Sequence, residues 1–95
     1  MASARPTTTI DNEQLRVTVW TFDAQGASTG RHLHEFDYLV VPVSGGLLHV
    51  TASDGAEHEL TQIAGSPYLG AAGTDHEVAS AGQAPITFVE VELKR

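Results

Sequence analysis

Cysteine is absent from this 95-residue sequence, and basic side chains are scarce. Without cysteine the chain forms no disulfide, thiolate metal site, iron–sulfur cluster or thiol nucleophile. Only 5 lysines and arginines stand against 12 aspartates and glutamates, which gives a formal net charge of −7 when the histidines are neutral. Affinity for nucleic acids and for anionic membranes begins with basic side chains that neutralise phosphates, so we expect neither partner.

Long apolar runs are also missing. No stretch approaches the roughly 20 apolar residues of a membrane helix, and no apolar run follows Arg5 as a secretory signal requires. We therefore expect a cytoplasmic protein. Hydrophobic residues still make up 41% of the chain, which is typical of a globular domain. Because so small a domain buries a small core, a bound metal or self-association is a common supplement to its stability.

Apolar residues recur at every second position, and Gly, Asn, Asp or Pro interrupts them about every 8 to 12 residues. No helix of useful length is predicted. Asp54-Gly55 is a hairpin signal. Residues 1–10 are interpreted as a flexible N-terminal tail, and residues 11–95 as a single domain. The longer predicted strands cover residues 15–22, 31–43, 47–53, 56–62 and 86–93. Seven or eight short strands with tight turns predict an all-β fold, either a sandwich or a small β-barrel.

Two of the five histidines, His32 and His34, lie two residues apart on a predicted strand. Their side chains therefore leave the same face, roughly 6.6 Å apart at the backbone. The same parity continues into Phe36, Tyr38 and Val40, so the face turns apolar. Histidines on a core-facing stripe are costly unless partners satisfy them. Neutral imidazole is the commonest metal ligand, which makes the pair a candidate metal site. The alternative is two half-exposed polar residues on a solvated strand.

Glycines and histidines also fall at spacings that resemble the two motifs of the cupin superfamily. The first motif is matched by Gly26, five residues, His32-Leu33-His34, three residues, Tyr38, six residues and Gly45. In the family the Tyr38 position is normally glutamate. The second is matched by Gly65, five residues, Ala71-Ala72-Gly73, two residues, His76, three residues and Ser80. There the family usually has proline at the Ala71 position and asparagine at the Ser80 position.

A narrower resemblance covers residues 11–94. The chain is similar to small stand-alone cupins associated with β-alanine degradation. The matching segments are residues 11–12, 32–42 and 88–94.

The resemblance implies a cupin-type small β-barrel, a double-stranded β-helix similar to a jelly roll, with a metal held by three histidines and one glutamate. Carried over by position, it gives His32, His34 and His76 as ligands. Tyr38 stands where the glutamate is expected, and a phenol with a pKa of about 10 is a poor ligand at neutral pH. We interpret Tyr38 as lining the substrate pocket, or else as a core tyrosine with a bonded hydroxyl. Three nitrogen donors suit a divalent transition metal (zinc, iron, nickel, copper or manganese) better than magnesium or calcium.

Carboxylates outside the motifs are expected to point away from this site. Glu35 and Asp37 have the opposite parity to the histidines. Glu90 and Glu92 share the parity of Phe88, which permits a place in the pocket, but we expect them on a solvated outer face.

The remaining polar and aromatic side chains are expected to have structural roles. We expect His49 and His58 on the surface or half-buried, Asp75 in a turn, and Arg31 pointing outward. Trp20 and Tyr68 are expected in core or interface packing.

Three functions fit these observations. The first is a metal-binding cupin that binds or transforms a small organic acid or amino-acid-derived metabolite. The second is a metal-free cupin that binds or senses a small ligand, as tyrosine in place of glutamate permits. The third is a non-catalytic structural subunit. Whether the protein is an enzyme is left open. Exposed sheet edges and a small core favour a homodimer.

Overall fold

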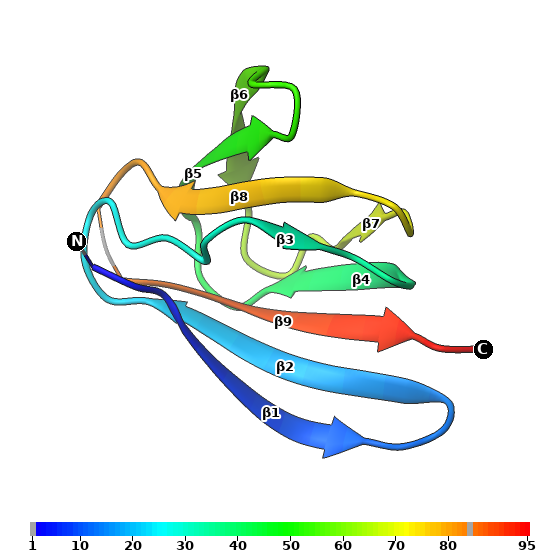
Figure 1. Cartoon of the computed structure of the whole chain (residues 1–95). Helices are drawn as coiled ribbons and strands as arrows, with labels where there is room; N and C mark the ends of the chain where they lie inside the picture. Colours follow the sequence, from blue (N-terminus) through cyan, green and yellow to red (C-terminus); the bar gives the residue numbers. More distant parts are fainter. Residues whose placement is uncertain (1, 84) are drawn as a thin grey trace.

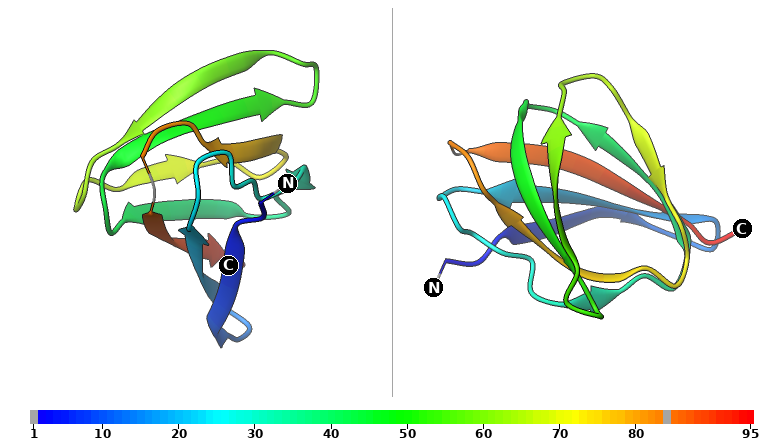
Figure 2. Two further views of the ribbon diagram at one scale, coloured as in Figure 1. Left: turned by 90° about the vertical axis from the view of Figure 1, so that its left-hand side faces the viewer. Right: turned by 90° about the horizontal axis from the view of Figure 1, so that it is seen from above.

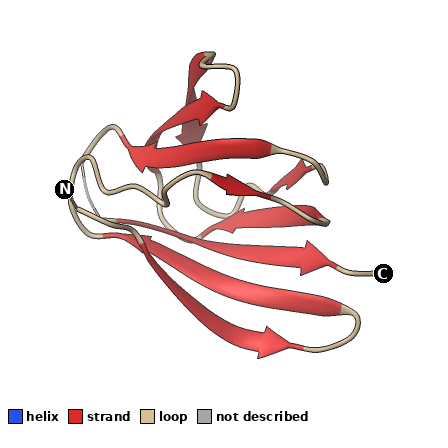
Figure 3. Ribbon diagram, viewed as in Figure 1, coloured by secondary structure: helices blue, strands red, loops and turns tan. Residues whose placement is uncertain are grey.

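The computed structural model describes residues 2–83 and 85–95, and in these residues it contains strands and loops only (Figures 1 and 3). Among them there is no helix, and hence none with the length and apolar character to cross a membrane. The nine strands are β1 (Arg5–Asp11), β2 (Leu15–Phe22), β3 (His32–Leu33), β4 (Asp37–Pro42), β5 (Gly46–Ala52), β6 (Glu57–Gln62), β7 (Tyr68–Gly70), β8 (Asp75–Ser80) and β9 (Ile86–Leu93).

The strands form two antiparallel sheets. The five-stranded sheet has the order β1-β2-β9-β4-β7, and the four-stranded sheet has the order β3-β8-β5-β6. Figure 1 and the left view of Figure 2 both show β5 and β6 at the end of the molecule opposite β1. Strands distant in sequence are neighbours, because β9 pairs with both β2 and β4, and β3 pairs with β8. This topology brings the two histidine motifs together.

The core occupies one half of the space between the sheets. Phe22, Leu48 and Ile86 are 0 to 1% exposed, and Phe88 packs against Phe22 with ring centroids 5.7 Å apart. Further along β9 the inward positions change to Glu90 and Glu92. The apolar core therefore gives way to a polar interior toward the C-terminal end of β9.

The tail predicted over residues 1–10 is corrected in part, because residues 5–11 form β1. This strand pairs with β2 from Arg5 opposite Thr21 to Asp11 opposite Arg16. Its threonines and isoleucine are β-branched and favour extended backbone, and Pro6 lies in an edge strand, where its missing donor is tolerated. All seven residues are exposed, so no burial pattern marks the strand. Residue 1 of the predicted tail lies outside the described residues.

The single long strand predicted over residues 31–43 is two strands, β3 and β4, in different sheets. Between them the chain crosses the fold, held by hydrogen bonds from the His34 amide to the Thr74 carbonyl (2.8 Å) and from the Gly73 amide to the His34 carbonyl (2.8 Å). This crossing carries His34 from the edge of one sheet toward the other.

Candidate metal centre

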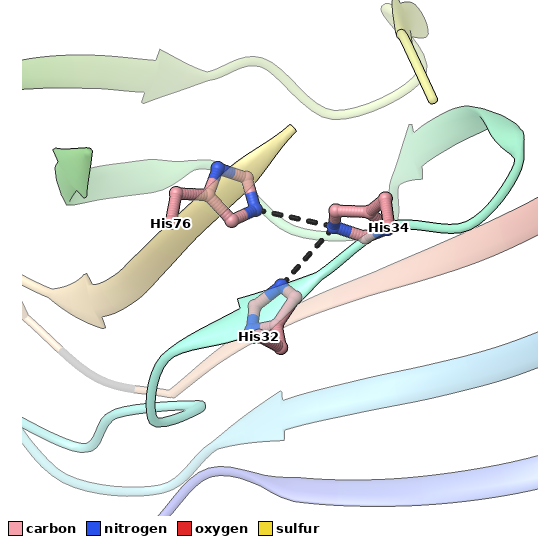
Figure 4. A group of neighbouring side chains, drawn as sticks. All are labelled: His32, His34 and His76. Carbon is pink, nitrogen blue, oxygen red and sulfur yellow. Dashed lines mark hydrogen bonds between the residues drawn. The ribbon is translucent and has the colours of Figure 1, made fainter. Parts of the chain in front are cut away.

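Three histidine side chains converge inside the fold from segments far apart in the sequence (Figure 4). His32 in β3 and His76 in β8 are paired across the two strands, and His34 follows β3 directly. The Nε2 atom of His34 lies 3.1 Å from Nε2 of His32 and 3.2 Å from Nε2 of His76. The structure therefore brings together all three of the histidines that the sequence pointed to.

Polar contacts hold the His32 ring in one orientation. Its Nδ1 atom lies 2.9 Å from the Gly30 carbonyl oxygen and 3.2 Å from the Thr29 hydroxyl. A carbonyl oxygen only accepts, so Nδ1 carries the hydrogen and donates it to Gly30. The Nε2 atom then presents its lone pair to the other two rings, which is how second-sphere contacts prepare a histidine for a metal.

An ion pair ties together the two strands that carry His32 and His76. Arg31 donates two hydrogen bonds to Asp75, with nitrogen–oxygen distances of 2.9 and 2.7 Å. Both residues immediately precede a histidine of the cluster. The sequence interpretation placed Arg31 outward and Asp75 in a turn. It missed their contact because the pairing of β3 with β8 cannot be read from local patterns.

The environment of the cluster keeps its buried histidines neutral, the form that binds a cation. Burial, and next the neighbouring imidazoles, lower the pKa of His34 and of His76 to about 4. Neutral imidazole is the ligand form. For metal–nitrogen bonds of about 2.1 Å, adjacent ligands are separated by about 3.0 Å in octahedral geometry and about 3.4 Å in tetrahedral geometry. The observed 3.1 and 3.2 Å lie between these values, so the three residues fit a transition metal.

Tyr38 forms a wall of the site. Its ring stacks on His34 with centroids 3.9 Å apart and an interplanar angle of 17°. The Tyr38 ring also lies over its cross-strand partner Gly70, where an added Cβ would clash with the ring. Burial and the nearby Glu90 carboxylate raise the pKa of Tyr38 above its usual range. The phenol thus stays protonated near neutral pH and braces His34.

Glu90 and Glu92 point into the fold, which corrects the expectation of a solvated outer face. Each is 8% exposed. Their strand is inverted relative to the usual pattern, because its aliphatic side chains Val89 and Val91 lie on the outer face. Period-two alternation identifies two faces of a strand but does not say which one is interior.

The two carboxylates have opposite electrostatic states. An Oε1 atom of Glu90 lies 3.9 Å from Nε2 of His34. Burial, and next the charge of Glu92, raise the pKa of Glu90 to about 7, although a hydrogen bond from Trp20 acts against the rise. Glu92 instead accepts two hydrogen bonds of 2.8 Å from Arg16, which lower its pKa. Glu90 is therefore the carboxyl group of the site with a variable charge near neutral pH.

A cavity of about 290 Å³ opens beside the histidines. Aromatic side chains form much of its wall, together with Glu90, and no lysine or arginine lines it among the described residues. The aromatic lining residues are Trp20, Tyr38, Tyr68 and Phe88. Trp20 and Tyr68, expected in packing, thus also face the cavity. A cavity of this size suits a small molecule.

Two remaining histidines differ in their relation to this cavity. His58 is exposed but lines it, a position that local sequence could not reveal. His49 lies outside and contacts Glu57 at 2.7 Å. The predicted outward orientation of Glu35 and Asp37 is confirmed, since both are exposed and Asp37 accepts a hydrogen bond from the Ala72 amide.

Comparison with known proteins identifies the fold and the family. No protein-family model matches the chain. The beta-alanine degradation protein BauB of Pseudomonas aeruginosa is 43% identical over 91 residues, covering 96% of this chain and 94% of that protein. A cupin domain from Bordetella pertussis is 36% identical, with a TM-score of 0.92 over 99% of this chain and 96% of the other. A double-stranded β-helix protein from Klebsiella pneumoniae, 20% identical, has a TM-score of 0.78 over 97% of this chain and 77% of its own.

These comparisons confirm the predicted all-β, double-stranded β-helix fold. The low identity of the Klebsiella protein supports the fold alone. The matches to BauB and to the Bordetella domain extend over nearly the whole chain and include the segments that carry the histidines. The chain belongs to the cupin superfamily, as a small member related to BauB.

Proposed function

We propose that this cupin binds one divalent transition metal through His32, His34 and His76, and binds or transforms a small organic acid or amino-acid-derived metabolite in the adjoining cavity. The convergence of one ring nitrogen from each histidine, all within 4.8 Å of one another, carries the proposal. Three neutral imidazoles with facing lone pairs satisfy one another poorly, whereas a cation satisfies all three.

A metal held at this position supplies a positive charge that attracts and polarises a carboxylate or carbonyl oxygen. The described lining has no lysine or arginine, so the chain itself offers no strong cation to an acidic ligand. Trp20, Tyr38 and Tyr68 surround the ligand with aromatic surface and exclude water. Glu90 faces the same space and offers a hydrogen-bonding carboxyl group beside His34.

The relationship to BauB supports the substrate class. That protein is named for beta-alanine degradation. Its similarity to this chain favours a small molecule derived from an amino acid, which also agrees with the cavity volume of about 290 Å³.

A second candidate is a metal-free cupin that binds or senses a small ligand, or serves as a structural subunit. The observation that favours it is Tyr38, which replaces the carboxylate expected at the metal by a protonated phenol. In that case the aromatic cavity alone binds the ligand.

Metal analysis of untagged protein prepared without chelator separates these proposals. We expect about one metal per chain in the wild type, and loss of it in His32→Ala and in His76→Ala, because each removes one of three ligands. His49→Ala is the matched control, since His49 contacts Glu57 outside the cavity. Absence of metal after reconstitution with zinc, iron(II), nickel, copper and manganese would overturn the first proposal and leave the metal-free one.

A further inference from the structure

Glu90 is a buried carboxylate that no basic side chain compensates. It is 8% exposed and lines the cavity. Among the described residues its only ionic contact is the 3.9 Å approach to His34, which is too long for a hydrogen bond. Arg16, on the neighbouring strand β2, is held by Glu92 through two hydrogen bonds of 2.8 Å. A buried carboxylate is costly until a cation pairs with it, so Glu90 favours a positively charged group in the ligand.

Aromatic rings surround this carboxylate on the inner face of the five-stranded sheet. Tyr68 lies in the same register row as Glu90, which runs across β2, β9, β4 and β7. Trp20 and Phe88 form the next row, and Tyr38 lies in the row before. All four rings line the cavity, and the Trp20 indole donates a hydrogen bond to Glu90. The carboxylate therefore lies among rings that leave its charge in place.

This combination of groups recognises an ammonium ion. The face of an aromatic ring attracts a cation, and a carboxylate accepts charge-assisted hydrogen bonds from an ammonium N–H. The described lining contains no lysine or arginine that would repel a cation, and the whole chain carries a net charge of −7. A second acidic group of a ligand would instead meet the like charge of Glu90.

The position of Glu90 differs from that of a metal ligand. The ligand atoms of His32, His34 and His76 all lie within 4.8 Å of one another, and Glu90 is not a member of this group. The carboxylate is therefore placed to contact a ligand beside the metal, and not the metal itself.

We propose that Glu90 and the aromatic rings around it form a binding subsite for an ammonium group, so that the ligand of this cavity is an amino acid or a related amine. The ammonium group donates hydrogen bonds to the Glu90 carboxylate and lies against the ring faces. The inference rests on the proposed function for the acidic end of the ligand, which a metal on the three histidines attracts, and on the cavity alone for the ammonium end.

A pair of probes of equal size tests the ammonium subsite without any metal. The n-butylammonium ion and n-butanol have the same number of non-hydrogen atoms and differ in charge. Trp20 is the single tryptophan of the chain and lines the cavity, so its fluorescence reports binding there directly. In chelator-treated, full-length wild type at pH 8, we expect n-butylammonium to bind at least about tenfold more tightly than n-butanol, because it gains a charged hydrogen bond in a buried site.

Glu90→Gln keeps the size of the side chain and removes its charge. We expect this variant to bind n-butylammonium no more tightly than n-butanol. Glu59→Gln is the matched control, because Glu59 is exposed on β6, does not line the cavity, and changes the net charge by the same amount when substituted. We expect Glu59→Gln to retain the wild-type preference.

A third probe separates this inference from the metal. The γ-aminobutyrate ion keeps the ammonium group and adds a carboxylate, so zinc-loaded wild type is expected to bind it at least about tenfold more tightly than n-butylammonium. Equal binding of these two ions, with n-butylammonium still preferred over n-butanol, would contradict the proposed function and support the ammonium subsite.

Three results would overturn the ammonium subsite. The first is wild type that binds n-butanol as tightly as n-butylammonium. The second is folded Glu90→Gln protein that keeps the preference for n-butylammonium. The third is wild type in which n-butylammonium, at up to about 50 mM, changes neither the fluorescence nor the indole N–H resonance of Trp20, because even a weak specific site is occupied at that concentration.

Discussion

Replacing Glu90 by glutamine is expected to stabilise the metal-free protein at alkaline pH. Burial, and next the charge of Glu92, raise the pKa of Glu90 from 4.5 to about 7. At 1.36 kcal/mol per pKa unit, holding the ionised carboxylate in the folded state costs about 3 kcal/mol. Because the folded pKa is above the unfolded one, the contribution of Glu90 to the free energy of unfolding is full below pH 4.5 and is lost as pH rises through 7.

Glutamine carries no charge, so Glu90→Gln removes this loss. We expect the free energy of unfolding of the variant to exceed that of the wild type by up to about 3 kcal/mol at pH 8 and by less than about 1 kcal/mol at pH 5. For a domain of this size the difference at pH 8 corresponds to a rise in Tm on the order of 10 °C. Urea unfolding of chelator-treated protein at pH 5, 6, 7 and 8 measures the difference directly.

Glu92→Gln is the matched control on the same strand. It weakens the two hydrogen bonds from Arg16 and removes a carboxylate whose pKa is lowered, so it should destabilise the protein at neutral pH. Opposite signs for the two substitutions at pH 8 are the expected result. A Glu90→Gln variant that is equally stable relative to wild type at pH 5 and pH 8 would refute the reasoning, because no pH-dependent penalty would then exist.

Three further predictions concern the metal centre. Because burial lowers the pKa of His34 and His76 to about 4, zinc binding displaces no proton from them at neutral pH. Zinc affinity, measured by chelator competition, should therefore change less than tenfold between pH 7.5 and 6, and a steeper fall would show imidazoles with an ordinary pKa. Tyr38→Glu should bind zinc at least about tenfold more tightly through an added carboxylate ligand, and it should lose thermal stability because the stacked ring is removed. An unchanged zinc affinity would place position 38 outside the coordination sphere. Arg31→Ala removes the ion-pair partner of Asp75 and should weaken zinc binding by about tenfold, with partial recovery in Arg31→Lys. Equal zinc affinity in the wild type and both variants would show that the ion pair does not support the metal centre.

Much of the fold and of the site was predictable because the relevant signals are local. Short period-two segments punctuated by turn residues predict strands without knowledge of their partners. Strand parity singles out His32 and His34, and the resemblance to the cupin motifs adds His76. The hairpin at Asp54-Gly55 is present between β5 and β6, with Gly55 at a φ of 88°.

What could not be predicted depends on which segments meet. The contact of Arg31 with Asp75 and the place of His58 on the cavity require the strand pairing of the second sheet. Strand β1 is not predicted from the sequence, because a strand with every residue exposed shows no alternation of buried and exposed positions. Glu90 and Glu92 were assigned to the wrong side because carboxylates usually mark the solvated face of a strand.

The inverted arrangement of β9 also creates a conflict during folding. A slip of one residue against β2 and β4 would turn Val89 and Val91 inward and send Glu90 and Glu92 into water, but it would also move Ile86 and Phe88 out of the core. On burial, the two halves of the strand therefore favour different registers. The native alignment is favoured by the burial of Ile86 and Phe88, by the Arg16–Glu92 ion pair and by the hydrogen bond from Trp20 to Glu90. The half of β9 that equips the cavity with carboxylates is thus a locally frustrated segment, whose register depends on polar contacts.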